Sequence, residues 1–116
     1  MKVLAHPTDF LPRYQMLKAS PGQNKAVLQA IEDIKQKLEE SSRPLGIHHR
    51  YDNIPIKYIQ RYGLQNLYHF EMPANFRLMY TVRKSPRESE LEALFLQLIS
   101  HDDYNKLFGY FKKKSY

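Results

Sequence analysis

The N-terminal part of the chain combines one short apolar run with two segments whose hydrophobic residues recur at helical spacing. The run Lys2–Ala5 predicts a strand. Thr8 or Asp9 can then cap a first helix, in which Pro12 falls in the first turn, where its missing N–H costs little. The apolar face of this helix is spaced at i, i+4 and i+7 and comprises Phe10, Tyr14 and Leu17.

A second helix is predicted by a start signal and an apolar stripe. Ser20-Pro21-Gly22-Gln23 matches a capping box, with serine at the N-cap, proline at N1 and glutamine at N3, and opens a helix that can run to Glu40. Its stripe consists of Val27, Ile31, Ile34 and Leu38. We therefore expect this helix to pack through one face, before the breaker stretch Ser41–Gly46 ends it.

The segment Ile47–Tyr62 mixes polar, aromatic and apolar residues without a clean period. Within it, Ile56–Tyr62 fits either a short helix ended by Gly63 or a strand. The adjacent His48 and His49 point apart and have no evident third ligand. We therefore expect a solvated loop at these histidines rather than a metal pair.

From Leu67 onward, the residues fall into two alternating sets, with the period of two that is typical of a strand. Leu67–Met72 and Phe76–Val82 are separated by Pro73-Ala74-Asn75, which predicts an antiparallel hairpin. After a polar turn at Lys84–Glu90, the run Leu94–Ile99 is apolar on both faces. Such a run is typical of a central strand that helices cover on one side and partly on the other.

The order of these elements predicts an α+β fold for a single domain spanning residues 1–116. Two N-terminal helices would pack on one face of a small antiparallel sheet, and a short C-terminal helix or turn would lie within Asp102–Tyr110. The hairpin residues expected to face the helices are Tyr68, Phe70, Met72, Phe76, Leu78, Tyr80 and Val82. The opposite face would stay open, and it would carry His69, Glu71, Arg77, Thr81 and Arg83.

Composition narrows the class of protein. The chain has 116 residues and no cysteine, which excludes disulfides and thiolate metal sites. It has neither the apolar region of a signal peptide nor the roughly 20 apolar residues that a membrane helix needs, so we expect a cytoplasmic protein without a membrane partner. Lys and Arg number 18 against 12 Asp and Glu, and the net charge of +6 favours a polyanionic partner such as nucleic acid.

Four polar residues of the predicted sheet offer a possible chemistry. His69, Glu71 and Arg77 share one face of the paired strands, and His101, at the end of the next strand, can join them. Metal-free RNA cleavage needs a base, a cation for the phosphate and an acid, and these residue types supply them. The same pattern also fits an ordinary charged sheet face in which Glu71 only pairs with Arg77. Because the sequence has no phosphate-cradling Gly-rich loop and no metal-protease motif, we expect neither a cofactor nor a metal.

Further residues are candidates for contacts with RNA. Tyr104 can stack on a base, and the cations Arg83, Lys106, Lys112 and Lys113 can contact phosphates. The competing interpretations are core packing for the aromatic ring and a solvated C-terminal end for the last lysines.

Two segments resemble a known family. The strand Phe76-Arg77-Leu78-Met79-Tyr80-Thr81-Val82 is similar to the aromatic-Arg-Leu-x-Tyr strand of the RelE/ParE toxin superfamily. The stretch Leu98-Ile99-Ser100-His101-Asp102-Asp103-Tyr104-Asn105-Lys106 resembles the strand end and the His-x-x-Tyr-Asp-Lys sequence of HigB-type members. Together with the two leading helices, the resemblance spans almost the whole chain.

The resemblance implies a RelE-like fold and a ribosome-dependent, metal-independent mRNA endoribonuclease of a type II toxin–antitoxin system, neutralised by a cognate antitoxin. Arg77 matches the phosphate-stabilising arginine of the family, and His101 matches the histidine of HigB-type members. His69 falls where RelE-type members carry a lysine, and Glu71 falls near a second lysine or, in other branches, a glutamate. Two alternatives stay open, namely a non-catalytic RelE-fold binding protein and a ParE-like inhibitor of DNA gyrase.

Overall fold

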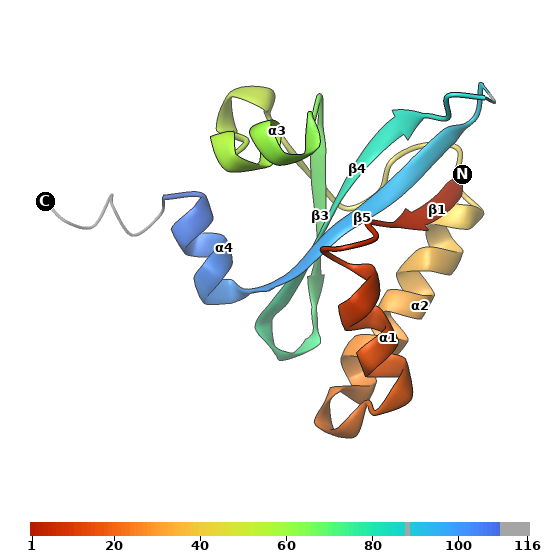
Figure 1. The fold of residues 1–116 in the computed structure, drawn as a ribbon, viewed down its shortest axis with the longest axis vertical. Helices are drawn as coiled ribbons and strands as arrows, with labels where there is room; N and C mark the ends of the chain where they lie inside the picture. Colours follow the sequence, from red (N-terminus) through yellow and green to blue (C-terminus); the bar gives the residue numbers. More distant parts are fainter. Residues whose placement is uncertain (88, 110–116) are drawn as a thin grey trace, which may run out of the picture.

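A computed structural model describes residues 1–87 and 89–109, and these form a five-stranded mixed sheet with four α-helices (Figure 1). The strands are β1 (Lys2–Ala5), β2 (Ile47–His49), β3 (Leu67–Met72), β4 (Phe76–Lys84) and β5 (Leu91–Ser100). The helices are α1 (Leu11–Ala19), α2 (Lys25–Glu39), α3 (Ile56–Tyr62) and α4 (His101–Leu107). The α+β class expected from the sequence is confirmed.

The sheet has the order β1-β5-β4-β3-β2. The hairpin of β3 and β4 is confirmed, with Glu71 opposite Arg77 and Met72 opposite Phe76. The expectation of an antiparallel sheet is wrong at one edge, because β1 lies parallel to β5. These two strands are separated by most of the chain, so no turn sequence fixes their relative direction, and tertiary packing sets it.

Helices α1 and α2 cover one face of the sheet, as expected. The four stripe residues of α2 are buried, and they share a core with the sheet residues Leu78, Tyr80 and Phe95. Every hairpin residue that the alternation assigned to this face belongs to the same core or packs against it. The period of two along β3 and β4 therefore identified the helix-facing side correctly.

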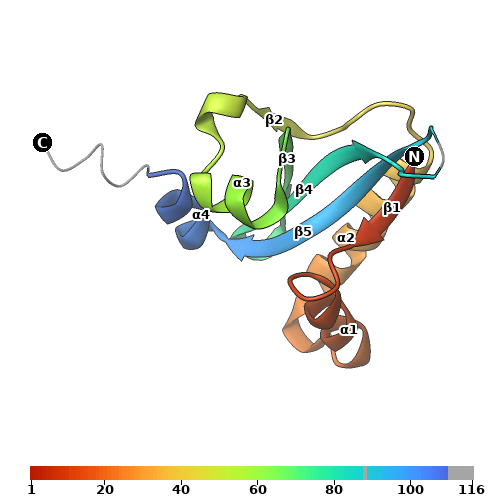
Figure 2. The same cartoon turned by 45° about the horizontal axis from the view of Figure 1, so that its top comes forward.

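The other face of the sheet is covered in part, which corrects the expectation of an open face. Helix α3 lies over it, away from α1 and α2 (Figure 2), and Tyr58 of α3 joins Leu67, Met79 and Leu96 in a second core. Consequently His69 and Thr81, expected to be exposed, are only 3% and 6% accessible to solvent. The segment Ile56–Tyr62 is a helix, and Gly63 ends it with a left-handed φ of 64°.

The helix starts differ from the sequence prediction. The capping box at Ser20 does not form, because Gly22 has a φ of +52°, outside the helical region, and a 3₁₀ turn over Gly22–Asn24 precedes α2. Helix α1 begins at Leu11, without a side-chain cap from Thr8 or Asp9. The N–H of Leu11 donates to the carbonyl oxygen of His6 instead, at 2.9 Å. None of the helices within residues 1–87 and 89–109 combines the length and the hydrophobicity that a membrane span requires.

Candidate functional site

Arg77 is the centre of a polar cluster at one end of the sheet. It lies near the start of β4, opposite Glu71 on β3 and Ile99 on β5. Its Nη2 is 2.9 Å from Nδ1 of His101 and 3.7 Å from Oε1 of Glu71. The Arg77 side chain is 13% exposed, whereas the Glu71 side chain is 65% exposed. Three of the four predicted catalytic residues are thus brought together around one guanidinium.

Helix α4 presents His101 to Arg77. The helix begins directly after β5, and the Ser100 side chain caps it by accepting a hydrogen bond from the Asp103 N–H at 3.1 Å. A guanidinium only donates, so Nδ1 of His101 accepts from Arg77 and the neutral ring carries its proton on Nε2. Nε2 in turn lies 3.1 Å from the side-chain amide of Asn105, one helical turn further on. The bond from Arg77 therefore orients the ring, and the Asn105 nitrogen lies beside Nε2 without accepting a hydrogen bond from it.

Aromatic rings support the buried side of Arg77. Its guanidinium lies over the Tyr104 ring, 5.5 Å from the centroid. Tyr104 stacks on Phe108 at 4.4 Å, and its ring is 5.1 Å from that of His69. Because Tyr104 is only 8% exposed, its ring packs beneath the Arg77 guanidinium in a cation–π contact. Stacking of Tyr104 on an RNA base stays a prediction.

His69 lies beside this cluster but is buried. Its Nδ1 is 2.7 Å from Nε2 of His49, which is also buried. The expectation that His49 belongs to a solvated loop is wrong, because it sits on β2 and faces β3. Desolvation, with the nearby His49 and the cation Arg77, lowers the pKa of His69 to about 4. A neutral, enclosed His69 is suited to packing under the site rather than to contact with a substrate.

The remaining predicted contacts are dispersed. Arg83 lies at the far end of β4, about 20 Å from Arg77 at ~3.3 Å per residue. There it pairs with the buried carboxylate of Glu92 at 2.9 Å. Lys106 is exposed on another side of α4 from His101, at a groove between α3 and α4. Lys112 and Lys113 lie outside the described residues.

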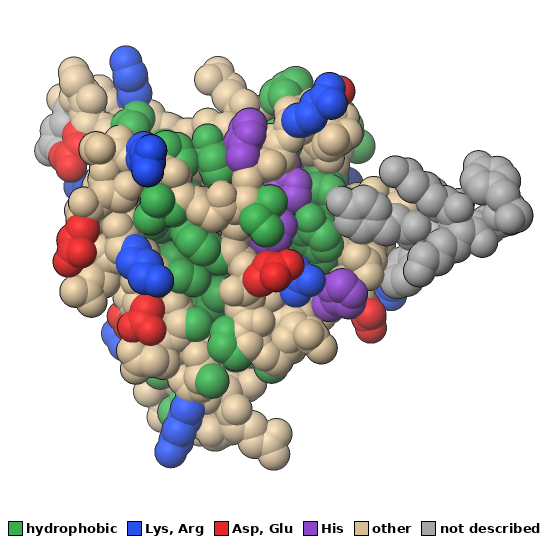
Figure 3. Space-filling view, turned by 180° about the vertical axis from the view of Figure 1, so that it is seen from behind, with side chains coloured by type: hydrophobic (Ala, Val, Ile, Leu, Met, Phe, Trp, Pro, Cys, Tyr) green, Lys and Arg blue, Asp and Glu red, His purple; other side chains and the backbone are tan. Residues whose placement is uncertain are grey.

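Figure 3 shows histidine side chains together with acidic and basic ones on one face of the molecule, beside a stretch of hydrophobic side chains. Among residues 1–87 and 89–109, no group of three or more His, Asp or Glu side chains is arranged to hold a metal ion. The Arg77 cluster offers hydrogen-bond donors, a fixed cation and acid–base groups. Such a set fits the binding of a phosphate diester and proton transfer at it.

Two contributors were missed at the level of sequence. Asn105 was detectable, because the spacing i, i+4 places it on the same side of a helix as His101. His49 was not detectable, because its partner His69 is on another strand and only the pairing of β2 with β3 brings the two rings together.

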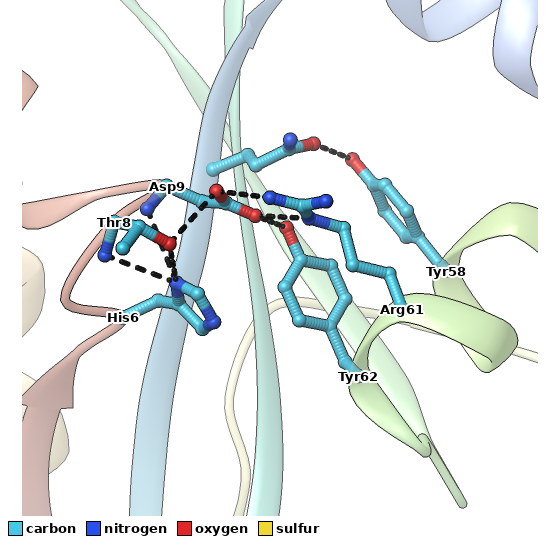
Figure 4. A network of polar contacts seen from close by, with 7 residues as sticks. His6, Thr8, Asp9, Tyr58, Arg61 and Tyr62 are labelled. Carbon is cyan, nitrogen blue, oxygen red and sulfur yellow. Dashed lines mark hydrogen bonds and ion pairs between the residues drawn. The ribbon is translucent and has the colours of Figure 1, made fainter.

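Helix α3 is fastened over the second face of the sheet by a polar network (Figure 4). The carboxylate of Asp9 accepts two hydrogen bonds from Arg61, at 2.5 and 2.6 Å, and another from the Tyr62 hydroxyl. These bonds hold the pKa of Asp9 far below its usual value, chiefly through Arg61. The backbone N–H of Asp9 donates to Nδ1 of His6. The network ties α3 to the segment between β1 and α1.

Comparison of the chain with protein-family models, with curated proteins and with solved structures found no significant match.

Proposed function

We propose that this protein is a toxin-like mRNA endoribonuclease with a RelE-like fold, which cleaves RNA without a metal ion as part of a type II toxin–antitoxin system. The observation that carries the proposal is the position of one largely buried guanidinium, Arg77, between the imidazole of His101 and the carboxylate of Glu71. A fixed cation flanked by two proton-transfer groups is the arrangement that transesterification of a phosphate diester requires.

Each residue has a role in the proposed reaction. A base removes the proton of the 2′-hydroxyl, whose oxygen attacks the adjacent phosphorus, and the bond to the 5′-oxygen breaks as an acid protonates that oxygen. Glu71 and His101 are the proposed base and acid, because both border Arg77. Arg77 donates to the phosphate oxygens that gain charge in the transition state. The products are a 2′,3′-cyclic phosphate and a 5′-hydroxyl.

Buried groups around the site have a positioning role in the proposal. His69 was a candidate catalytic residue, but its burial leads us to assign it, with His49 and Tyr104, to the support of Arg77. A site held by packed rings keeps its guanidinium in place before the substrate binds, which lowers the cost of reorganisation during the reaction.

The two segments that resemble the RelE/ParE superfamily meet at this cluster. The aromatic-Arg-Leu-x-Tyr segment supplies Arg77 on β4, and the His-x-x-Tyr segment supplies His101 and Tyr104 on α4. Their contact in space supports reading both as parts of one site. The proposed partners are therefore mRNA, the translating ribosome and an antitoxin protein, and the net charge of +6 favours the polyanionic ones.

The test is to induce the wild-type protein, Arg77→Ala and Arg43→Ala separately in cells, and to follow growth and mRNA 5′ ends. Arg43 is an exposed arginine in the loop between α2 and β2, so its variant removes the same charge away from the site. We expect wild type and Arg43→Ala to arrest growth and create new 5′ ends. Arg77→Ala should reduce cleavage by about 100-fold or more.

Other outcomes point to other functions. Growth arrest without new mRNA ends, together with inhibition of DNA supercoiling, would indicate a ParE-like gyrase inhibitor. Tight binding to RNA without cleavage or arrest, by folded and abundant protein, would indicate a non-catalytic binding protein. Normal cleavage by Arg77→Ala would overturn the assignment of the site.

A further inference from the structure

A groove lies on the second face of the sheet, between α3 and α4. Its volume is about 750 Å³, which is in the range of small-molecule sites. The groove shares helix α4 with the Arg77 cluster, because His101 and Asn105 contact that cluster while Lys106 and Leu107 line the groove. Ile99, which also lines the groove, is the direct neighbour of Arg77 across β4 and β5. The groove thus begins one strand away from the proposed cleavage site.

A β-bulge turns a glutamine toward this groove. Tyr80 pairs with Phe95 and Met79 pairs with Gln97, so Leu96 is an extra residue on β5. Phe95 and Leu98 belong to the core under α1 and α2, whereas Leu96 and Ile99 belong to the core under α3. Strict alternation would have placed Gln97 with Phe95, but the bulge places it on the face of Ile99. Gln97 lines the groove accordingly.

A buried tyrosine fixes the orientation of the Gln97 amide. The Tyr58 hydroxyl donates to Oε1 of Gln97 at 2.6 Å, and this bond from Tyr58 is drawn in Figure 4. Desolvation raises the pKa of Tyr58 well above its usual value, so the hydroxyl keeps its proton and remains a donor. With Oε1 engaged, the amide NH₂ is the group that Gln97 offers to a ligand.

The rest of the groove combines apolar walls with cations at the rim. Ile56, Ile99 and Leu107 supply apolar lining, and Lys57 and Lys106 are exposed at the edge. Asp103 also lines the groove, and Arg61 lines it while its guanidinium is paired with Asp9. Apolar lining together with one oriented donor suits a nucleobase that presents an acceptor, and the lysines suit the attached phosphate.

We propose that this groove binds one nucleotide of a single-stranded RNA, with Gln97 donating to the base and Lys57 and Lys106 contacting its phosphate. The proposal rests on the proposed function only in taking RNA as the ligand. It gives the RNA a second contact site on the protein, next to Arg77. Tyr58 acts here as a positioning residue for Gln97.

Equilibrium binding of a short, fluorescently labelled single-stranded RNA tests the groove separately from cleavage. The RNA carries 2′-O-methyl groups, which remove the attacking hydroxyl, and fluorescence anisotropy is recorded over a range of salt concentrations. Gln97→Glu keeps an acceptor for Tyr58 but replaces the donor NH₂ with an anion. Lys57→Gln and Lys106→Gln remove one rim charge each. Lys84→Gln removes one exposed charge at the other end of β4 and is the matched control.

We expect Gln97→Glu to weaken binding by about tenfold or more, through loss of the base contact. Each rim variant should weaken binding and lower the slope of log K against log salt by at most about 0.7, the value for one phosphate contact on a single strand, because the two lysines share one phosphate. Lys84→Gln should bind like wild type. Circular dichroism checks that Gln97→Glu is folded, and the exposed rim lysines give an independent readout.

The outcomes separate this proposal from the proposed function. If the groove variants bind like Lys84→Gln, or if wild type does not bind the RNA, the groove proposal fails, whatever is found for cleavage. If binding depends on Gln97 and Lys57 while no cleavage occurs, the groove proposal stands and the endoribonuclease assignment fails.

Discussion

Arg77 and His69 lie on the same face of two neighbouring strands, yet their exposure to solvent differs. The Arg77 side chain is 13% exposed at the end of the sheet, and His69 is 3% exposed beneath the rings of Tyr104 and His49. Alternation along a strand determines on which face of the sheet a side chain lies. The elements packed on that face then decide whether water or substrate reaches the side chain. In the proposed function, this difference separates Arg77, which can touch RNA, from His69, which positions another group.

Buried His69 makes the stability of the protein depend on pH. Its pKa is about 4 in the folded protein and 6.5 when unperturbed, so the unfolded state binds the proton more readily. The contribution of His69 to the free energy of unfolding is complete above pH 6.5 and is lost as the pH falls from 6.5 toward 4. This contribution amounts to about 3 kcal/mol. We expect the free energy of unfolding in urea to fall over this range.

A matched variant isolates the histidine contribution. His69→Asn keeps a polar atom near the place of Nδ1 for His49 but cannot be protonated. Its unfolding free energy should fall less steeply between pH 7 and about pH 5 than that of wild type. His49, whose pKa is also lowered by burial, keeps part of the slope. Equal slopes for the two proteins would contradict the assignment.

At the scale of elements, irregularities in the strands place the functional side chains. The bulge at Leu96 turns Gln97 toward α3, and a left-handed Gly46 leads the chain into β2. The bulge is not visible in the sequence, because the run Leu94–Ile99 around it is apolar on both faces, whereas Gly46 closes the breaker stretch Ser41–Gly46. β-Bulges redirect one side chain at the cost of one unpaired residue, so their effect is local and their position depends on how two strands pair.

Gly46 should be essential for the placement of β2. Its φ is +85°, and a Cβ would lie 2.6 Å from the carbonyl oxygen of His69. Gly46→Ala should therefore lower the free energy of unfolding by about 3 kcal/mol or more. Gly22→Ala is the control, because Gly22 also has a positive φ but has no atom within 4 Å of such a Cβ. It should cost about 1 kcal/mol in the same urea titration. Equal losses would show that contact with His69 is unimportant.

At the scale of the whole molecule, the sheet separates two cores. One core lies under α1 and α2 and the other under α3 and α4, and both include residues of β4 and β5. Because the same strands contribute side chains to both faces, loss of one core removes the support of the other. The Arg77 cluster and the groove both depend on the second core, through Tyr104 and Ile99.

The two cores should unfold together. Leu38 belongs to the first core and Leu67 to the second, and both are fully buried. Leu38→Ala and Leu67→Ala should each lower the free energy of unfolding by about 2–5 kcal/mol, because each leaves a cavity. Each variant should show a single urea transition that coincides by tyrosine fluorescence and by circular dichroism. Two separated transitions for Leu67→Ala would show that the second core melts alone.

Hydrophobic periodicity determined most of the local structure. The apolar stripe of α2, the hairpin and the helix-facing residues of β3 and β4 follow from spacing alone, because helices and strands repeat with fixed periods. The proximity of Glu71 to Arg77 follows in the same way, since a hairpin turn sets its own register.

Only the tertiary structure decided what covers the second face. The parallel pairing of β1 with β5, the contact of His49 with His69 and the docking of α3 through Asp9 and Arg61 join segments far apart in sequence. Such contacts depend on the packing of whole elements, and no local pattern of residues encodes them. For this reason the sequence predicted the residues around Arg77, while the burial of His69 and the groove at Gln97 emerged only from the fold.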